Sequence, residues 1–84
     1  VKSKEVMAAA WNGLGKAYAG LAKGKDKNLM HKDLMAHLRV ALVYSGFRNE
    51  RLEALKLAVS AAGKLGLEKT RNELNSEYKT AKGQ

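Results

Sequence analysis

The stretch Leu34–Gly63, LMAHLRVALVYSGFRNERLEALKLAVSAAG, carries the densest apolar pattern of the chain. Its first part repeats along one helical face at i, i+4, i+7 and i+11, at Leu34, Leu38, Ala41 and Ser45. Met35 and Leu42 widen this stripe, so that much of the helix circumference is apolar. A helix of this kind packs on two sides, and we expect this one to lie at the centre of the fold.

The same stretch contains a helix stop and a helix start. Gly46 fits the left-handed position that follows a helix end, where a residue without Cβ is favoured. Asn49 fits the N-cap of the next helix, whose inward stripe begins at Leu52. Arg39–Tyr44 alone also resembles a short buried strand, but no second run of this kind could pair with it. The stretch therefore predicts a helical hairpin.

The first helix shows two stripes. Ser3 can cap it, and large apolar residues then repeat as an a/d seam: Met7, Trp11, Leu14, Tyr18 and Leu21. A second stripe holds only small residues: Ala10, Gly13, Ala17 and Gly20. We expect the seam to be core, with Trp11 buried, and another backbone to approach the small stripe closely.

The composition predicts an all-α fold. The chain has 84 residues, 45% of them hydrophobic, and contains no proline and no cysteine. The absence of proline, together with abundant Ala, Leu and Lys, favours helices. The absence of cysteine excludes disulfides and thiolate metal sites. We predict a small bundle of about four antiparallel helices in one domain, residues 1–84. The expected helices span 4–22, 30–45, 49–63 and 67–81.

The charge is strongly and unevenly positive. The net charge is +8, and residues 1–48 hold nine Lys and Arg against three acidic residues. A basic half of this kind suggests an anionic partner, whether nucleic acid, an acidic protein surface or anionic lipid. No apolar run reaches the length of a membrane span and no signal peptide is visible, so we expect an intracellular, cytoplasmic protein.

The segment Trp11–Tyr18 matches the opening W-x2-L-G-x2-Y of the tetratricopeptide repeat in all four positions. Val40 and Leu74 are 34 residues apart, which is the period of that repeat. The chain therefore resembles a tetratricopeptide-like stack of helical hairpins, and the resemblance implies a protein-binding fold. It departs from the repeat at His37 and Arg71, which replace large apolar residues, and it lacks the closing proline.

A second resemblance lies at Ala61–Leu67, which is similar to the first half of a helix-turn-helix motif. The recognition helix of that motif needs apolar residues on its inward face. Asn72 and Asn75 occupy those positions here, and the apolar stripe lies at Leu74 and Tyr78 instead. This reading would imply DNA binding.

Catalytic signatures are not visible. His31 and His37 are six residues apart and do not share a helical face, so they do not form a metal-ligand pair, and we expect His37 at the rim of a helix contact. Gly20–Asp26 resembles a phosphate loop superficially, but it is one residue short and ends in Asp26 where Ser or Thr is required. We expect a protein that is not an enzyme and that holds no cofactor or metal.

Basic residues form the best candidate binding site, because loop lysines beside a helix start can hold an anion. These residues are Lys23, Lys25, Lys27, Lys32 and Arg39. Val43, Phe47 and Leu57 are candidates for apolar contacts with a partner. We predict a helical interaction module that binds an acidic protein or peptide. The alternative is a basic nucleic-acid-binding helical domain.

Overall fold

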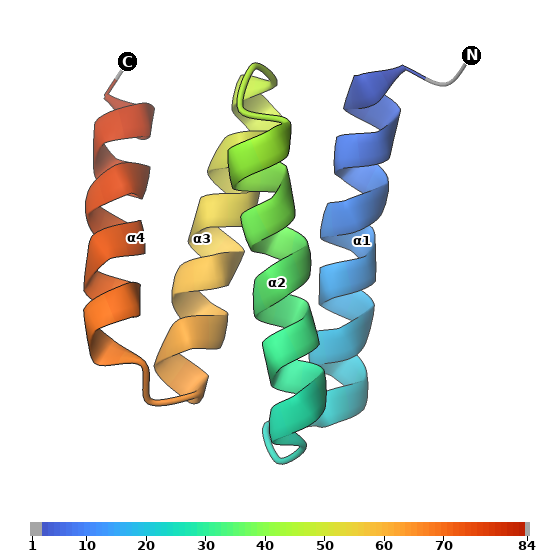
Figure 1. Ribbon diagram of the computed structural model, residues 1–84, viewed down its shortest axis with the longest axis vertical. Helices are drawn as coiled ribbons and strands as arrows, with labels where there is room; N and C mark the ends of the chain where they lie inside the picture. Colours follow the sequence, from blue (N-terminus) through green and yellow to red (C-terminus); the bar gives the residue numbers. More distant parts are fainter. Residues whose placement is uncertain (1–2, 84) are drawn as a thin grey trace.

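A computed structural model describes residues 3–83, and within them it contains four α-helices and no strand (Figure 1). The helices are α1 (Lys4–Ala22), α2 (Lys27–Val43), α3 (Arg48–Lys64) and α4 (Glu68–Lys82). Short turns make each helix antiparallel to the one before it. The predicted all-α fold is confirmed, and Arg39–Val43 belongs to α2 and not to a strand.

Two helices begin as capping rules predict. The Ser3 hydroxyl accepts a hydrogen bond from the Val6 amide at 3.2 Å, and the Asp26 carboxylate accepts one from the Leu29 amide at 3.2 Å. Each side chain satisfies one of the unpaired N–H groups of a first turn. Because Asp26 is the N-cap, α2 begins at Lys27, three residues before the expected start.

The turn between α2 and α3 differs from the prediction. Phe47, and not Asn49, occupies the N-cap position of α3, where no side chain caps the helix. Gly46 is not left-handed. The left-handed glycine of the second half is Gly66, at φ 76°, where the Leu67 amide donates to the Ala62 carbonyl at 2.9 Å and closes α3.

The helices lie side by side in chain order as an open array (Figure 1). Each helix packs on the next one, α1 also touches α3, and α4 packs on α3 alone within residues 3–83. The array measures 35 × 29 × 14 Å along its principal axes. Because α4 does not return to α1, no helix of the described residues packs on the outer faces of the α1–α2 hairpin.

Small residues dominate the core. Alanines on α3 are fully buried at Ala54, Ala58 and Ala62, and the largest fully buried side chains are Leu55, His37 and Val40. Alanine faces let helix backbones approach closely, and the interdigitated Leu and Val side chains fill the space between them. His37 is therefore part of the core, and the expected position at a rim is wrong.

The first helix is rotated relative to the prediction. Its buried residues are Ala8, Asn12, Gly15 and Ala22, whereas Met7 and Leu14 of the predicted seam are exposed. The predicted small stripe is exposed too, and a Cβ at Gly13 or Gly20 would meet nothing within 4 Å. The expectation of a buried seam is wrong for Met7, Leu14 and Leu21, whereas Trp11 and Tyr18 are half-buried and Trp11 packs against the core. The expectation for the small stripe is wrong, because a different set of small residues meets α2 and α3.

The close contact between Gly15 and His37 determines which face of α1 points inward. A Cβ built there would lie 2.5 Å from His37 Nε2, far inside van der Waals contact. The imidazole ring of α2 therefore occupies the space that any other residue at this position would fill. Large side chains from the outer seam could not replace Gly15 without expelling the ring.

Substitution of two glycines in the same helix tests this fit. We expect Gly15→Ala to lower the free energy of unfolding by about 1–3 kcal/mol, the usual cost of overpacking. Gly13→Ala, the matched control, should raise it by up to about 1 kcal/mol, because alanine is the better helix former and the site is open. Urea unfolding followed by circular dichroism measures both. Equal stability of the two variants would show that the ring does not lie against Gly15.

Candidate functional site

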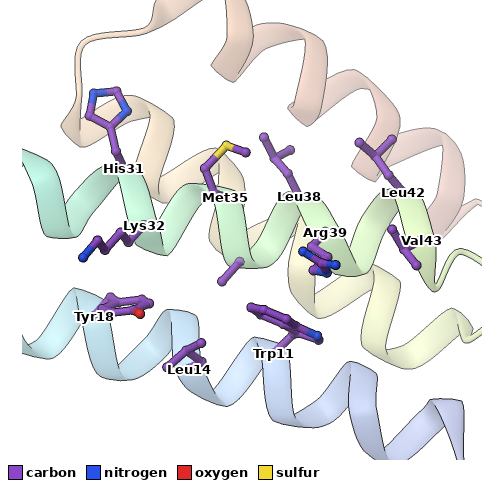
Figure 2. A pocket seen from close by; sticks show the side chains of 11 residues that line it. Trp11, Leu14, Tyr18, His31, Lys32, Met35, Leu38, Arg39, Leu42 and Val43 are labelled. Atoms are coloured by element: carbon purple, nitrogen blue, oxygen red, sulfur yellow. The ribbon is translucent and has the colours of Figure 1, made fainter.

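An apolar groove of about 470 Å³ runs along the outer face of the α1–α2 hairpin (Figure 2). It is lined from α1 by Trp11, Leu14 and Tyr18 and from α2 by His31, Lys32, Met35, Ala36, Leu38, Arg39, Leu42 and Val43. We call it the α1–α2 groove. It lies on the side of α2 opposite the buried Asp33, His37 and Val40.

The apolar walls of the groove are unusually exposed. Leu42 is 74% exposed, Met35 and Val43 are each 63% exposed, and Leu14 is 39% exposed. These side chains lie on adjoining turns of two neighbouring helices, so they form one continuous surface. Contiguous apolar surface on this scale marks an interaction site, whereas single exposed apolar residues do not.

Two basic side chains lie over the two aromatic rings. The Arg39 guanidinium is 4.6 Å from the centre of the Trp11 ring, and Lys32 Nζ is 5.8 Å from the centre of the Tyr18 ring. Each cation is attracted by the face of its ring, a contact worth about 0.5–1 kcal/mol at exposed sites. The rings therefore hold both positive charges beside the apolar wall.

None of the described residues that line the groove has a carboxylate side chain. Three acidic residues precede the α2–α3 turn: Glu5 lies in the first turn of α1, Asp26 caps α2, and Asp33 is buried on the opposite side of α2. Lys32 and Arg39 are thus not neutralised by an acidic residue of the groove wall. The site combines an apolar floor with unopposed positive charge.

The structure brings together three of the eight predicted site residues. Lys32, Arg39 and Val43 line the α1–α2 groove. The other five lie elsewhere: Lys23, Lys25 and Lys27 are exposed at the α1–α2 turn, Phe47 packs against the core, and Leu57 lines a cavity of about 140 Å³ beside Asp33. The predicted basic residues therefore lie in two separate places, the α1–α2 turn and the α1–α2 groove.

Sequence reasoning missed Leu14, Met35 and Leu42, because it assigned them to the core. Trp11 and Tyr18 were likewise assigned to the core; both are half-buried and line the groove, and Trp11 also packs against the core. One signal was available: Trp11 and Tyr18 are seven residues apart, as are Lys32 and Arg39. Equal spacing on two antiparallel helices predicts that each cation meets one ring.

A buried polar network lies on the inner side of the same hairpin. Asn12 Nδ2 donates to the Glu50 carbonyl at 3.0 Å, which leaves Oδ1 to accept from His37 Nδ1 at 2.9 Å. His37 Nε2 lies 3.0 Å from Asp33 Oδ1, but the two are not aligned as a hydrogen bond, and this oxygen has no hydrogen-bond partner within residues 3–83. The network joins α1, α2 and α3.

This network fixes the position of the His37 ring between three helices. One ring nitrogen of His37 is held by Asn12 and the other faces Asp33, and both His37 and Asp33 also line the cavity of about 140 Å³ at Leu57. Burial lowers the pKa of His37 to about 4, with Glu53 opposing this shift and Lys16 adding to it. Burial also raises the pKa of Asp33, which Lys64 partly opposes. The imidazole is therefore neutral near pH 7.

We expect this neutral histidine to make stability depend on pH. In the unfolded chain His37 takes up a proton near pH 6.5, whereas in the fold it does so near pH 4. Between these values the unfolded state binds more protons, so stability falls as the pH falls. Asp33, whose pKa is raised, contributes the opposite slope, so the net change should stay below about 1.4 kcal/mol per pH unit.

Urea unfolding between pH 4 and 7 measures this dependence. His37→Phe should flatten the curve in that window, because it removes the titrating ring. His31→Gln serves as the control, since His31 is exposed, and it should keep the slope of the unaltered protein. A slope that survives in His37→Phe and disappears in His31→Gln would contradict the assignment.

Other kinds of site are not seen in residues 3–83. They hold no group of three or more His, Cys, Asp or Glu side chains that could bind a metal ion. Each helix in this range is too short or too polar to cross a lipid bilayer.

Comparison of the chain with models of known protein families, with curated proteins and with solved structures gives no match in any of the three. The tetratricopeptide resemblance therefore stays a prediction, and the geometry of the groove carries the functional argument.

The groove position of Trp11 changes what its removal should cost. Trp11→Ala should lower the free energy of unfolding by less than Leu55→Ala, because Trp11 is half-buried and Leu55 is 1% exposed. Truncation of a buried leucine costs about 2–5 kcal/mol. Thermal and urea unfolding of the two variants gives the comparison. A larger loss for Trp11→Ala would place the indole in the core.

Proposed function

We propose that this domain is a non-enzymatic interaction module whose α1–α2 groove binds an acidic, amphipathic helix of a partner protein. One observation carries the proposal: α1 packs inward with Ala8, Asn12 and Gly15, and the middle of its large apolar seam, Trp11, Leu14 and Tyr18, lines the groove. A helix that stabilised only its own fold would bury that seam.

The apolar wall supports a protein partner. Leu14, Met35, Leu42 and Val43 together present a continuous apolar surface that costs free energy while it faces water. A partner that covers one such leucine side chain gains about 1.5–3 kcal/mol. A phosphate backbone gains nothing from this surface, which favours a protein over nucleic acid.

The charge supports an acidic partner. Lys32 and Arg39 stand over the groove with no carboxylate of the groove wall beside them, and three further lysines lie at the α1–α2 turn. An acidic segment would be attracted to this face and oriented on it, whereas a basic one would be repelled. The net charge of +8 also disfavours a second copy of the chain as the occupant.

The shape supports a helical partner. The groove follows the direction of two adjacent antiparallel helices, and α3 already packs along the other face of the same hairpin. A helix laid along the groove would repeat that packing with its apolar stripe inward. The tetratricopeptide resemblance is consistent with this proposal, since repeats of that kind bind proteins.

A designed peptide tests the function. The probe is an amphipathic helix of about three heptads with Leu on one face and Glu on the other. We expect it to change the fluorescence of Trp11, the only tryptophan, and to saturate on titration. The same peptide with Lys in place of Glu should bind much more weakly, because it keeps the apolar face and reverses the charge.

Two leucine variants locate the contact. Leu42→Gln, in the groove, should weaken binding about tenfold, the effect of roughly 1.4 kcal/mol of lost apolar burial. Leu21→Gln should leave affinity unchanged, since Leu21 is 68% exposed but lies outside the groove. Equal effects at both sites, or binding of a labelled oligonucleotide that the peptide cannot displace, would contradict the proposal.

A further inference from the structure

The two cation–aromatic contacts form a repeated pattern in the α1–α2 groove. Trp11 pairs with Arg39 and Tyr18 pairs with Lys32. The aromatic members are seven residues apart on α1, and the cationic members are seven residues apart on α2. Since α1 and α2 run antiparallel, the two pairs cross the groove at two levels, which we call rungs (Figure 2).

An apolar centre lies between the rungs. Leu14 comes midway between Trp11 and Tyr18 on α1, and Met35 comes midway between Lys32 and Arg39 on α2. Both side chains line the groove, and both are exposed. Along its length the groove thus presents a positive charge, an apolar floor and a second positive charge.

The distance between the rungs matches a helical repeat. Seven residues of an α-helix rise about 10.5 Å, which is two turns. A partner helix that lies along the groove has the same rise, so its own residues seven apart face the groove at matching heights. Residues three or four positions after the first of this pair point at the apolar centre.

Resting on the proposed function, we infer that the groove recognises a spacing: two carboxylate side chains seven residues apart on one helical face, with a large apolar side chain between them. One carboxylate pairs with Arg39 and the other with Lys32, while the apolar side chain packs on Leu14 and Met35. The partner is thus an acidic helix of defined register.

The rings make this recognition selective. A lysine or arginine that is free in water loses side-chain freedom when it forms an ion pair, which offsets most of the gain. Trp11 and Tyr18 already restrict Arg39 and Lys32 in the free protein, so less freedom remains to be lost on binding. The exposed lysines of the α1–α2 turn have no ring contact of this kind within residues 3–83.

Two peptides of equal composition test the spacing. Both are Leu-faced helices with two Glu residues and otherwise neutral polar residues, and the Glu pair is seven residues apart in one and eleven apart in the other. Both spacings keep the pair on one helical face, so the distance alone differs. At low salt the seven-residue peptide should bind about fivefold more tightly, the size of one ion pair gained.

Two further measurements assign the effect to the rungs. High salt should remove the preference, because exposed ion pairs are screened. Arg39→Gln and Lys32→Gln should each remove it as well, whereas Lys27→Gln, which changes the net charge equally at an exposed site outside the groove, should keep it. Circular dichroism verifies that each variant is folded.

The outcomes separate the two proposals. Equal, saturable binding of both peptides would overturn the spacing rule and leave the acidic-helix groove standing. A preference that survives in Arg39→Gln and Lys32→Gln would also overturn it, since the carboxylates would then contact other residues. Failure of both of these peptides and of the Leu/Glu probe to bind would overturn the proposed function together with the spacing rule.

Discussion

The fold of the hairpin depends on one buried ring. The imidazole of His37 lies against Gly15, donates to Asn12 at 2.9 Å and faces Asp33 at 3.0 Å. Asn12 in turn donates to the backbone of α3, so a single polar network connects three helices. A buried polar group that lost its partner would cost about 1–3 kcal/mol, which makes other rotations of α1 unfavourable.

The rotation of α1 has a direct consequence for the surface. With Asn12 and Gly15 facing inward, Trp11, Leu14 and Tyr18 fall on the flank of α1 that borders the outer face of α2, where Trp11 and Tyr18 are half-buried and Leu14 is exposed. In the open array of residues 3–83, that side has no neighbouring helix. The same constraint that holds the core together therefore creates the groove, and Lys32 and Arg39 acquire their aromatic partners from it.

Four helices and their approximate bounds could be predicted, because apolar periodicity and caps such as Ser3 are local properties. The inward face of α1 could not. Hydrophobicity favoured the face with Trp11, whereas the structure is decided by the fit between Gly15 and His37, two residues far apart in the sequence. The error carried over to the site. Lys32, Arg39 and Val43 were predicted from charge and exposure, but Leu14, Met35 and Leu42 had been assigned to the core.

Thiol accessibility tests which face of α1 meets the rest of the protein, since the chain contains no cysteine and a single introduced thiol reports one position. Leu14→Cys and Ala8→Cys place that thiol on different sides of α1, at positions that are 39% and 0% exposed. In the folded protein, the thiol at position 14 should react with a water-soluble disulfide reagent nearly as fast as in urea, and the thiol at position 8 should be protected. Protection at position 14 with rapid reaction at position 8 would show that the apolar seam is buried and that the groove does not exist.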